Sequence, residues 1–220
     1  GSHRYPVGFS GDTVVTWESL DFQPYFTATA SNIGYGWWSH DIGGHMLGIR
    51  SDVMEARWYE LGTFSPINRL HSTKMSFSGK EPWNFRPEVE HAMGESLRLR
   101  HQLLPYLYTM NYLAYKEYRP VIAPMYYDYP EKEQAYPVQD HSFVEGVSNN
   151  QYLFGTDMIV APITSDQIAS LNQGKVKAWI PEGCYHDFFT GLIYKGEKVM
   201  WMFRGINSIP VLVKAGGIIP

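Results

Sequence analysis

Hydrophobic residues change their spacing once along the chain, near residue 119, and this change predicts two structural regions. In the first region, short apolar runs over residues 3–9 and 32–40 predict buried strands. Each run ends in a glycine-containing turn that carries an acid, Asp12 after the first and Asp41 after the second.

Helical spacing follows the second of these strands. Ser51 is suited to cap a helix, and Asp52 beside it favours the helix dipole. Apolar side chains then recur at helical intervals as far as the stop signal Gly62. Residues 63–69 predict another short strand, so this part of the chain alternates strand and helix.

A longer helix is predicted to begin near Pro87. Its apolar face contains Val89, Met93, Leu97, Leu104, Leu107 and Leu113. Pro105 lies in the middle of this stretch and removes a backbone donor, so we expect a kink there.

After Pro120 the chain becomes a series of short apolar runs separated by turn residues, which is typical of an all-β domain. The predicted strands are residues 121–127, 158–163, 176–180, 185–189, 199–203 and 209–213. We therefore divide the chain into an α/β region, 1–118, and a β domain, 119–220. The apolar, strand-like residues 215–220 lead us to expect that the β domain is incomplete.

Composition narrows the classes of function. The formal charge is −4 and the 18 Lys and Arg form no dense cluster, which argues against a nucleic-acid partner. Cys184 is the only cysteine, so a cysteine metal site and an internal disulfide are excluded. No apolar run is long enough to span a bilayer, and we expect no membrane association. Localisation stays open, with a slight preference for the cytoplasm.

Ionisable residues follow the predicted strands of the α/β region. Asp12, Asp41 and the Arg69/His71 pair each come at or just after a strand end. In barrel enzymes the carboxyl ends of the strands meet at one mouth, which favours a shared active site. Capping or turn formation is the alternative for any single acid, and it stays open.

The segment around Asp41 also has the composition of a metal loop, with His40, Asp41 and His45 as candidate ligands. Neighbouring residues of a strand point to opposite faces, so His40 and Asp41 do not reach one ion together. We expect no metal or other cofactor and interpret His40 as a core histidine. Gly43 and Gly44 are predicted to form a tight turn beside the pocket.

Five segments, taken in order, resemble glycoside hydrolase family 31, the α-glucosidases and α-xylosidases. They are RYPVGFSGDT (4–13), GYGWWSHDIGGH (34–45), FSPINRLHS (64–72), LRLRHQLLPYLYT (97–109) and FGTDMIVAPI (154–163). The resemblance implies a (β/α)8 TIM barrel, of which residues 1–118 are the carboxyl-terminal part, followed by a β-sandwich domain.

The resemblance also implies roles for individual residues. Asp12 matches the general acid/base, which has to hold a proton in the resting enzyme. Asp41 matches the acid that binds sugar hydroxyls, and Arg69 and His71 match an Arg-x-His element of the same pocket. Three further residues are expected to line the pocket: Phe9, Trp38 and His45. Phe9 and His45 depart from the residues that many members carry there, which bears on linkage preference.

The family's nucleophilic aspartate lies on an earlier strand than any in this chain. We therefore expect the chain to act with the missing amino-terminal half of the same enzyme and to be inactive alone. The expected substrate is an oligosaccharide or disaccharide with terminal α-linked glucose.

Other interpretations stay open. The 7 Trp and 16 Tyr suit stacking on sugar rings but equally suit an aromatic core. A carbohydrate-binding protein without catalysis, a scaffold built on a partial barrel, and an α-xylosidase or transglycosylase of the same family are the alternatives.

Overall fold

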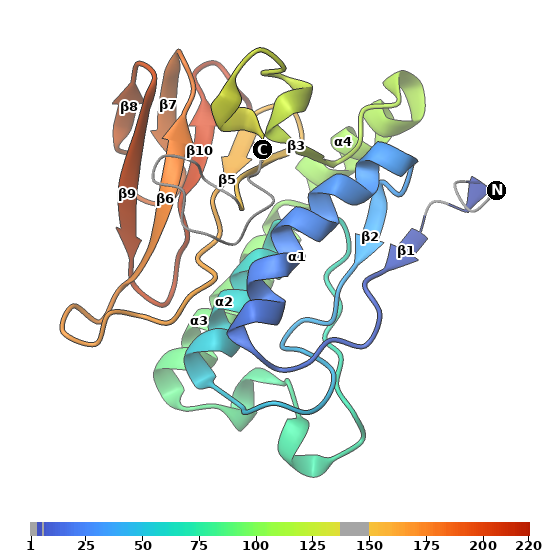
Figure 1. Cartoon of the computed structure of the whole chain (residues 1–220), viewed down its shortest axis with the longest axis vertical. Coiled ribbons are helices and arrows are strands. Elements are labelled where there is room, and N and C mark those ends of the chain that lie inside the picture. The colour runs from blue at the N-terminus through green and yellow to red at the C-terminus, as the bar shows by residue number, and fades with distance from the viewer. Residues whose placement is uncertain (1–3, 6, 137–149) are drawn as a thin grey trace.

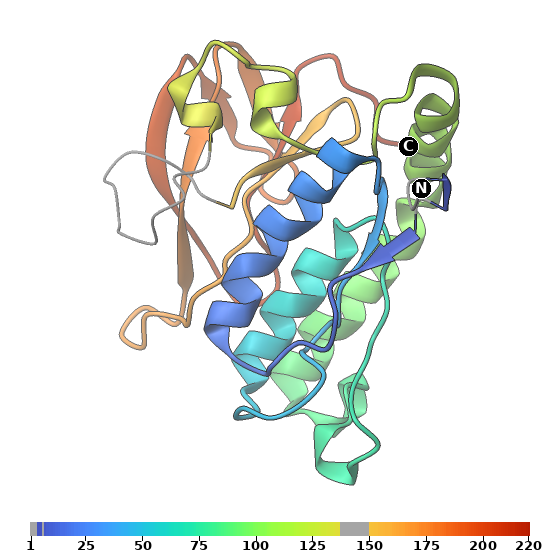
Figure 2. The ribbon, with the colours of Figure 1, turned by 45° about the vertical axis from the view of Figure 1, so that its right-hand side comes forward.

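The computed structural model describes residues 4–5, 7–136 and 150–220. Helices α1, α2 and α3 run side by side through the middle of the molecule (Figures 1 and 2). Strands β1 and β2 lie on one side of these helices, and the carboxyl-terminal strands lie on the other. No helix in the described ranges has the length and apolar character needed to cross a membrane.

The α/β region opens with a strand–helix–strand unit. Strands β1 (Val7–Phe9) and β2 (Trp37–Ser39) are parallel, and helix α1 (Trp17–Ala30) connects them. The Thr16 hydroxyl caps α1 by accepting the amide of Ser19 at 3.2 Å. The hydrophobic pattern did not reveal α1, because Pro24 lies inside it and its apolar residues do not gather on one face. His3, at the start of the predicted first strand, lies outside the described residues.

Helix α2 (Asp52–Thr63) begins as predicted, with the Ser51 hydroxyl accepting the amide of Met54 at 3.3 Å. The helix continues one residue past Gly62. The predicted strand over 63–69 is therefore wrong: its first residue belongs to α2, and only Leu70 beyond it forms a parallel bridge, with Ile42.

The predicted kink is a break. Helix α3 (Pro87–Gln102) ends at Leu103, and α4 (Leu104–Glu117) begins directly after it. Pro105 lies in the first turn of α4, where its missing amide leaves no intrahelical bond unmade. Short 3₁₀ turns occur at Ser31–Ile33, Ser76–Ser78, Pro82–Asn84, Met125–Tyr127 and Glu133–Ala135.

The carboxyl-terminal region contains two antiparallel sheets. The larger sheet has the order β3-β4-β5-β10-β7-β8, and β6 pairs with β9 in the smaller one. The bounds are β3 Ile122–Pro124, β4 Tyr152–Phe154, β5 Met158–Val160, β6 Gly174–Ile180, β7 Cys184–Asp187, β8 Ile193–Lys195, β9 Lys198–Arg204 and β10 Val211–Lys214. Strands β4 and β8 were not predicted.

The larger sheet is buried on both faces, as alternation along its strands shows. Tyr152 and Phe154 of β4 pack in the core shared with the helices, whereas Leu153 packs in a second core. That second core also contains Trp179 and Met202 from the smaller sheet. The two sheets therefore pack face to face, as in a β-sandwich.

Buried polar contacts fix this β region onto the helices. Arg57 of α2 donates to the carbonyl oxygens of Ser208 at 2.9 Å and Arg204 at 3.1 Å. The hydroxyl of Tyr152 donates to the carbonyl of Phe64 at 2.9 Å. The helices thus form a common layer between the β domain and the loops that follow β1 and β2.

Candidate active site

Two carboxyl and two imidazole side chains come together beyond the carboxyl ends of β1 and β2. They are Asp12, Asp41, His45 and His71, and one ligand atom from each lies within 4.8 Å of one from every other. Asp12 follows β1, Asp41 follows β2, and His71 follows the bridging residue Leu70. Parallel pairing places these three chain segments at one edge, which explains why residues so distant in sequence meet.

Asp41 is fully buried and held by donors on both oxygens. Oδ1 accepts from the Arg69 guanidinium at 2.7 Å, and Oδ2 accepts from the amide of Thr13 at 3.2 Å. Arg69 is itself fixed, because its Nε donates to the Ser39 hydroxyl at 3.1 Å and its guanidinium lies 5.2 Å from the Phe9 ring centroid. Each Asp41 oxygen retains a lone pair, so the carboxylate can also accept from a ligand hydroxyl.

Asp12 has a different environment. Its side chain is 51% exposed, and the nearest ionisable partner is His45, whose Nε2 lies 3.6 Å from Oδ2. The carboxyl is therefore accessible to a ligand, close to but distinct from the buried Asp41.

His45 and His71 lie face to face beside the two acids. Their ring centroids are 4.4 Å apart, with an interplanar angle of 20°. The backbone around His45 is bound to both neighbouring segments: its amide donates to Thr13 at 2.6 Å, and its carbonyl accepts from Thr73 at 2.9 Å. The loop 41–46 therefore links the Asp12 turn to the His71 segment.

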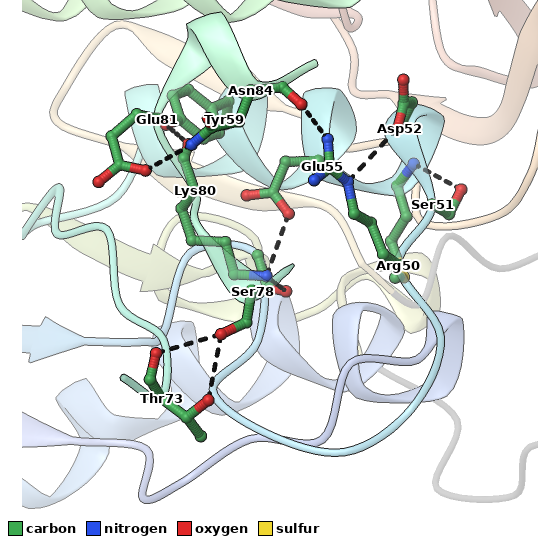
Figure 3. A network of polar contacts seen from close by, with 12 residues as sticks. Arg50, Ser51, Asp52, Glu55, Tyr59, Thr73, Ser78, Lys80, Glu81 and Asn84 are labelled. Atoms are coloured by element: carbon green, nitrogen blue, oxygen red, sulfur yellow. Dashed lines mark hydrogen bonds and ion pairs between the residues drawn. The ribbon is translucent and has the colours of Figure 1, made fainter. Parts of the chain in front are cut away.

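A buried ion pair between Lys80 and Glu55 contacts this loop (Figure 3). Lys80 donates to the carbonyl of Gly43 at 2.8 Å and to Glu55 Oε2 at 3.3 Å. Burial raises the pKa of Glu55 from 4.5 to about 7, although Lys80 acts in the opposite direction. Gly43 and Gly44 both have positive φ, as expected for a tight turn, and a Cβ on Gly43 would lie 2.1 Å from Glu55 Oε1.

The two faces of β2 serve different purposes. Ser39 and Asp41 face the cluster, whereas Trp38 and His40 face the helices. The Trp38 ring packs 4.7 Å from Phe26 of α1, with its side chain largely buried. The prediction that Trp38 lines the pocket is therefore wrong, because alternation along the strand turns it toward α1.

His40 is a core histidine, as expected. Its Nδ1 accepts from the Trp58 indole at 3.1 Å, and its Nε2 lies 2.8 Å from the Ser65 hydroxyl. That hydroxyl donates to the carbonyl of Leu61, so Nε2 of His40 is the protonated nitrogen. Burial first, and then Arg69, lower the pKa of His40 from 6.5 to about 3, which keeps the ring neutral.

Sequence reasoning missed four residues that shape the site. Thr13 and Ser39 orient Asp41 and Arg69, and Glu55 and Lys80 hold the loop. Only Ser39 was accessible to a sequence argument, since it lies two positions before Asp41 on the same face of the strand.

Two family profiles cover nearly the whole chain. Residues 1–110 match the profile described as "Glycosyl hydrolases family 31 TIM-barrel domain". Residues 118–219 match "Glycosyl hydrolase family 31 C-terminal domain". The first match alone spans half of the chain.

Curated relatives align along all of the chain. Neutral alpha-glucosidase C of Mus musculus is 28% identical over 223 residues, which cover 100% of this chain and 23% of that protein. The alpha-xylosidase of Saccharolobus solfataricus is 28% identical over 226 residues, covering 100% of this chain and 28% of that protein. The chain thus spans about a quarter of the length of these relatives.

Solved structures agree with the sequence matches. A GH31 alpha-xylosidase from a soil metagenome, complexed with xylose, has a TM-score of 0.81 and 27% identity, over 96% of this chain and 32% of that one. A GH31 dextranase of Flavobacterium johnsoniae, complexed with glucose, has a TM-score of 0.83 and 28% identity, over 97% and 26%. Profiles, relatives and structures together show that the chain belongs to glycosyl hydrolase family 31.

Proposed function

We propose that this chain supplies the general acid/base and part of the sugar pocket of a retaining α-glycosidase that removes terminal α-linked glucose from oligosaccharides. The nucleophilic carboxylate then comes from a part of the enzyme outside this chain. One observation carries the proposal: two neighbouring carboxyl groups occupy opposite environments. Asp12 is half exposed with one weak partner, whereas Asp41 is buried with a donor on each oxygen.

The mechanism assigns the proton to Asp12. A retaining enzyme uses two carboxyl groups about 5–5.5 Å apart, one on each side of the scissile bond. Asp12 donates its proton to the glycosidic oxygen while the second carboxylate attacks the anomeric carbon and forms a glycosyl-enzyme. Asp12 then removes a proton from water, which attacks the anomeric carbon and releases the sugar and the nucleophile.

The sugar residue whose glycosidic bond is broken is bound by Asp41, Arg69 and His71. Asp41 accepts hydrogen bonds from sugar hydroxyls, and its bond to Arg69 keeps the carboxylate oriented while it does so. His71 donates to another hydroxyl of the same sugar. Such charge-assisted contacts strengthen as positive charge develops on the sugar ring. Phe9 and His45 complete the wall of the pocket.

This assignment also fits the architecture that we propose. Strands β1 and β2 and the bridge at Leu70 represent the last three strands of a (β/α)8 barrel, which ends near residue 118. The active site then lies where barrel enzymes place it, beyond the carboxyl ends of the strands.

Replacement of Asp12 tests the proposal in the complete polypeptide that contains this chain. In Asp12→Ala we expect hydrolysis of a glucose disaccharide to fall by about 10²–10⁴-fold, because its leaving group requires protonation. An aryl α-glucoside with a good leaving group should retain a rapid first step, and added azide should restore turnover. Asp166→Ala, which changes an exposed carboxylate of a loop, is the matched control.

The outcome also separates the alternatives. A wild-type rate for Asp12→Ala on the disaccharide removes Asp12 from the mechanism. A protein that binds glucose but shows no turnover in any form is a carbohydrate-binding protein, and one that binds no sugar is a scaffold. Residues 1–220 by themselves are expected to show no turnover, so activity of that fragment contradicts the external nucleophile.

The choice of sugar needs its own measurement, since a glucosidase and a xylosidase are both among the relatives. We expect kcat/KM for aryl α-glucoside to exceed that for aryl α-xyloside. The reverse ranking would make the enzyme an α-xylosidase. Transfer of the sugar to an added acceptor, in preference to water, would make it a transglycosylase.

A further inference from the structure

From the sequence we expected no metal, because His40 and Asp41 cannot reach one ion together. His40 indeed lies in the core with Trp58 and Ser65. The structure instead brings together two carboxylates and two imidazoles from four separate chain positions. We propose that Asp12, Asp41, His45 and His71 form a binding site for a divalent transition-metal ion, represented by Zn²⁺, that competes with sugar.

The chemistry of these ligands selects the class of ion. Imidazole nitrogen and carboxylate oxygen together suit Zn²⁺ and its neighbours in the first transition row. Mg²⁺ and Ca²⁺ prefer an all-oxygen shell, and two of the four ligands are nitrogens. The site therefore discriminates between ions by ligand type.

The distances require only local movement. In a tetrahedral zinc site with bonds of about 2.0–2.2 Å, ligand atoms are about 3.3–3.6 Å apart. Here the four atoms already lie within 4.8 Å of one another, and His45 Nε2 is 3.6 Å from Asp12 Oδ2. Closing the set takes shifts on the order of 1 Å, together with a turn of the stacked rings so that both nitrogens face the ion.

The surroundings allow that movement. The Asp12 side chain is half exposed, and the buried Nδ1 of His45 has no hydrogen-bond partner among the described residues. Turning the His45 ring therefore breaks no hydrogen bond of its side chain. Asp41 needs no movement away from Arg69, since Oδ2 has a lone pair beyond the one that accepts from Thr13.

The local charge also favours a dication. Zinc displaces the proton that Asp12 holds in the resting enzyme, so in the bound state Asp12 and Asp41 contribute two negative charges. Arg69 neutralises one of them through its 2.7 Å bond to Asp41. The remaining negative charge is that of Asp12, next to the two imidazoles. Arg69 weakens the attraction, so we expect binding looser than at a structural zinc site.

Zinc at this position has a functional consequence, which rests on the proposed function. A metal-bound Asp12 is held as the carboxylate and has no proton to give to the glycosidic oxygen. The ion also occupies the donors and acceptors that would otherwise contact sugar hydroxyls. We therefore expect zinc to inhibit hydrolysis reversibly and sugar to weaken zinc binding.

Calorimetry tests the site directly. The complete polypeptide, prepared without a histidine tag, is titrated with ZnCl₂ and separately with MgCl₂ at neutral pH. We expect one zinc per chain and no comparable magnesium binding. His45→Phe, His71→Phe and Asp12→Asn should each bind zinc at least about tenfold more weakly. His186→Phe, which removes an exposed histidine of β7, should bind it as the wild type does.

Several results would overturn the inference. Equal zinc affinity in the wild type and the ligand variants is one, and equal binding of Mg²⁺ and Zn²⁺ is another. Circular dichroism checks that each variant is folded, and Asp12→Asn alters an exposed side chain, so at least one variant stays informative. Binding is measured without turnover: zinc binding in a protein that cleaves no glycoside supports the site and refutes the proposed function, whereas an active enzyme without zinc binding does the reverse.

Discussion

Lys80 holds the loop 41–46 of the candidate site through a side chain that is almost completely buried. Its side chain is 7% exposed and that of its partner Glu55 is 2% exposed. Lys80→Met keeps most of the side-chain volume but removes the ammonium group. Two contacts are lost: the bond to the Gly43 carbonyl and the ion pair with Glu55.

The loss in free energy of unfolding caused by Lys80→Met depends on whether Glu55 remains charged. Removing one partner of a buried ion pair typically costs about 3–5 kcal/mol when the other charge stays. Glu55, however, already has a pKa of about 7, and the rise from 4.5 corresponds to about 3 kcal/mol that the wild type already bears. Without Lys80 the pKa rises further, and at pH 7 the carboxyl takes up a proton.

The lost bond to Gly43 then dominates at pH 7. A hydrogen bond to a charged donor is worth about 1.5–3 kcal/mol, so we expect Lys80→Met to lower the free energy of unfolding by about 2–3 kcal/mol. Above pH 7 the wild-type Glu55 is ionised in both the folded and unfolded states, and its contribution becomes flat. In the variant the folded state still binds the proton, so its stability keeps falling, by up to about 1.4 kcal/mol per pH unit.

Urea unfolding at about pH 7 and about pH 9 measures both effects. Lys74→Met, which alters an exposed lysine of the same loop, serves as the control. In a Glu55→Gln background the cost of Lys80→Met should no longer grow with pH. The reasoning is refuted if Lys80→Met costs the same at both pH values, or if it costs no more than Lys74→Met.

Three further predictions concern buried residues. Gly43→Ala should destabilise the protein by at least about 2 kcal/mol, since its Cβ meets Glu55 at 2.1 Å and φ is +90°; a wild-type thermal midpoint would contradict this. Burial raises the pKa of Glu60 to about 7, so the free energy of unfolding of the wild type falls as pH rises from about 4.5 through 7. In Glu60→Gln, urea unfolding should show about half of this pH dependence, because Glu55 contributes the other half. His40→Phe should cost about 1–3 kcal/mol at pH 7 by leaving the Trp58 indole unpaired. Because the wild type keeps His40 neutral down to a pKa of about 3, its stability falls below pH 6.5, and the deficit of the variant should shrink at about pH 5.

The sequence predicted helix boundaries correctly where a single residue determines them. Ser51 marks the start of α2 because its hydroxyl caps the helix, and Pro105 marks the break between α3 and α4 because it has no amide to donate. Helix α1 escaped prediction, since Pro24 argues against a helix and only packing on both sides outweighs it. Residues 63–69 have an apolar pattern that suits a strand, yet α2 extends into them.

The candidate site was predictable to the extent that strand ends converge. Asp12, Asp41 and His71 are distant in sequence and meet because β1, β2 and Leu70 are parallel neighbours. The support of the site was not predictable. Lys80 and Glu55 are 25 residues apart, on a loop and on a helix, and no spacing rule connects such positions.

Asp12 and Asp41 differ because the fold places different hydrogen-bond donors beside them. Asp41 is placed where the amide of Thr13 and the guanidinium of Arg69 can both donate, so its charge is stabilised although no solvent reaches it. Asp12 follows Gly11, which has a φ of +80°, and receives no comparable donor from the described residues. The Asp41 carboxylate is therefore fixed in one orientation, whereas the half-exposed Asp12 carboxyl stays accessible to a ligand. The proposed division of tasks, with hydroxyl binding at Asp41 and proton transfer at Asp12, thus rests on an unequal distribution of hydrogen-bond donors between two strand ends.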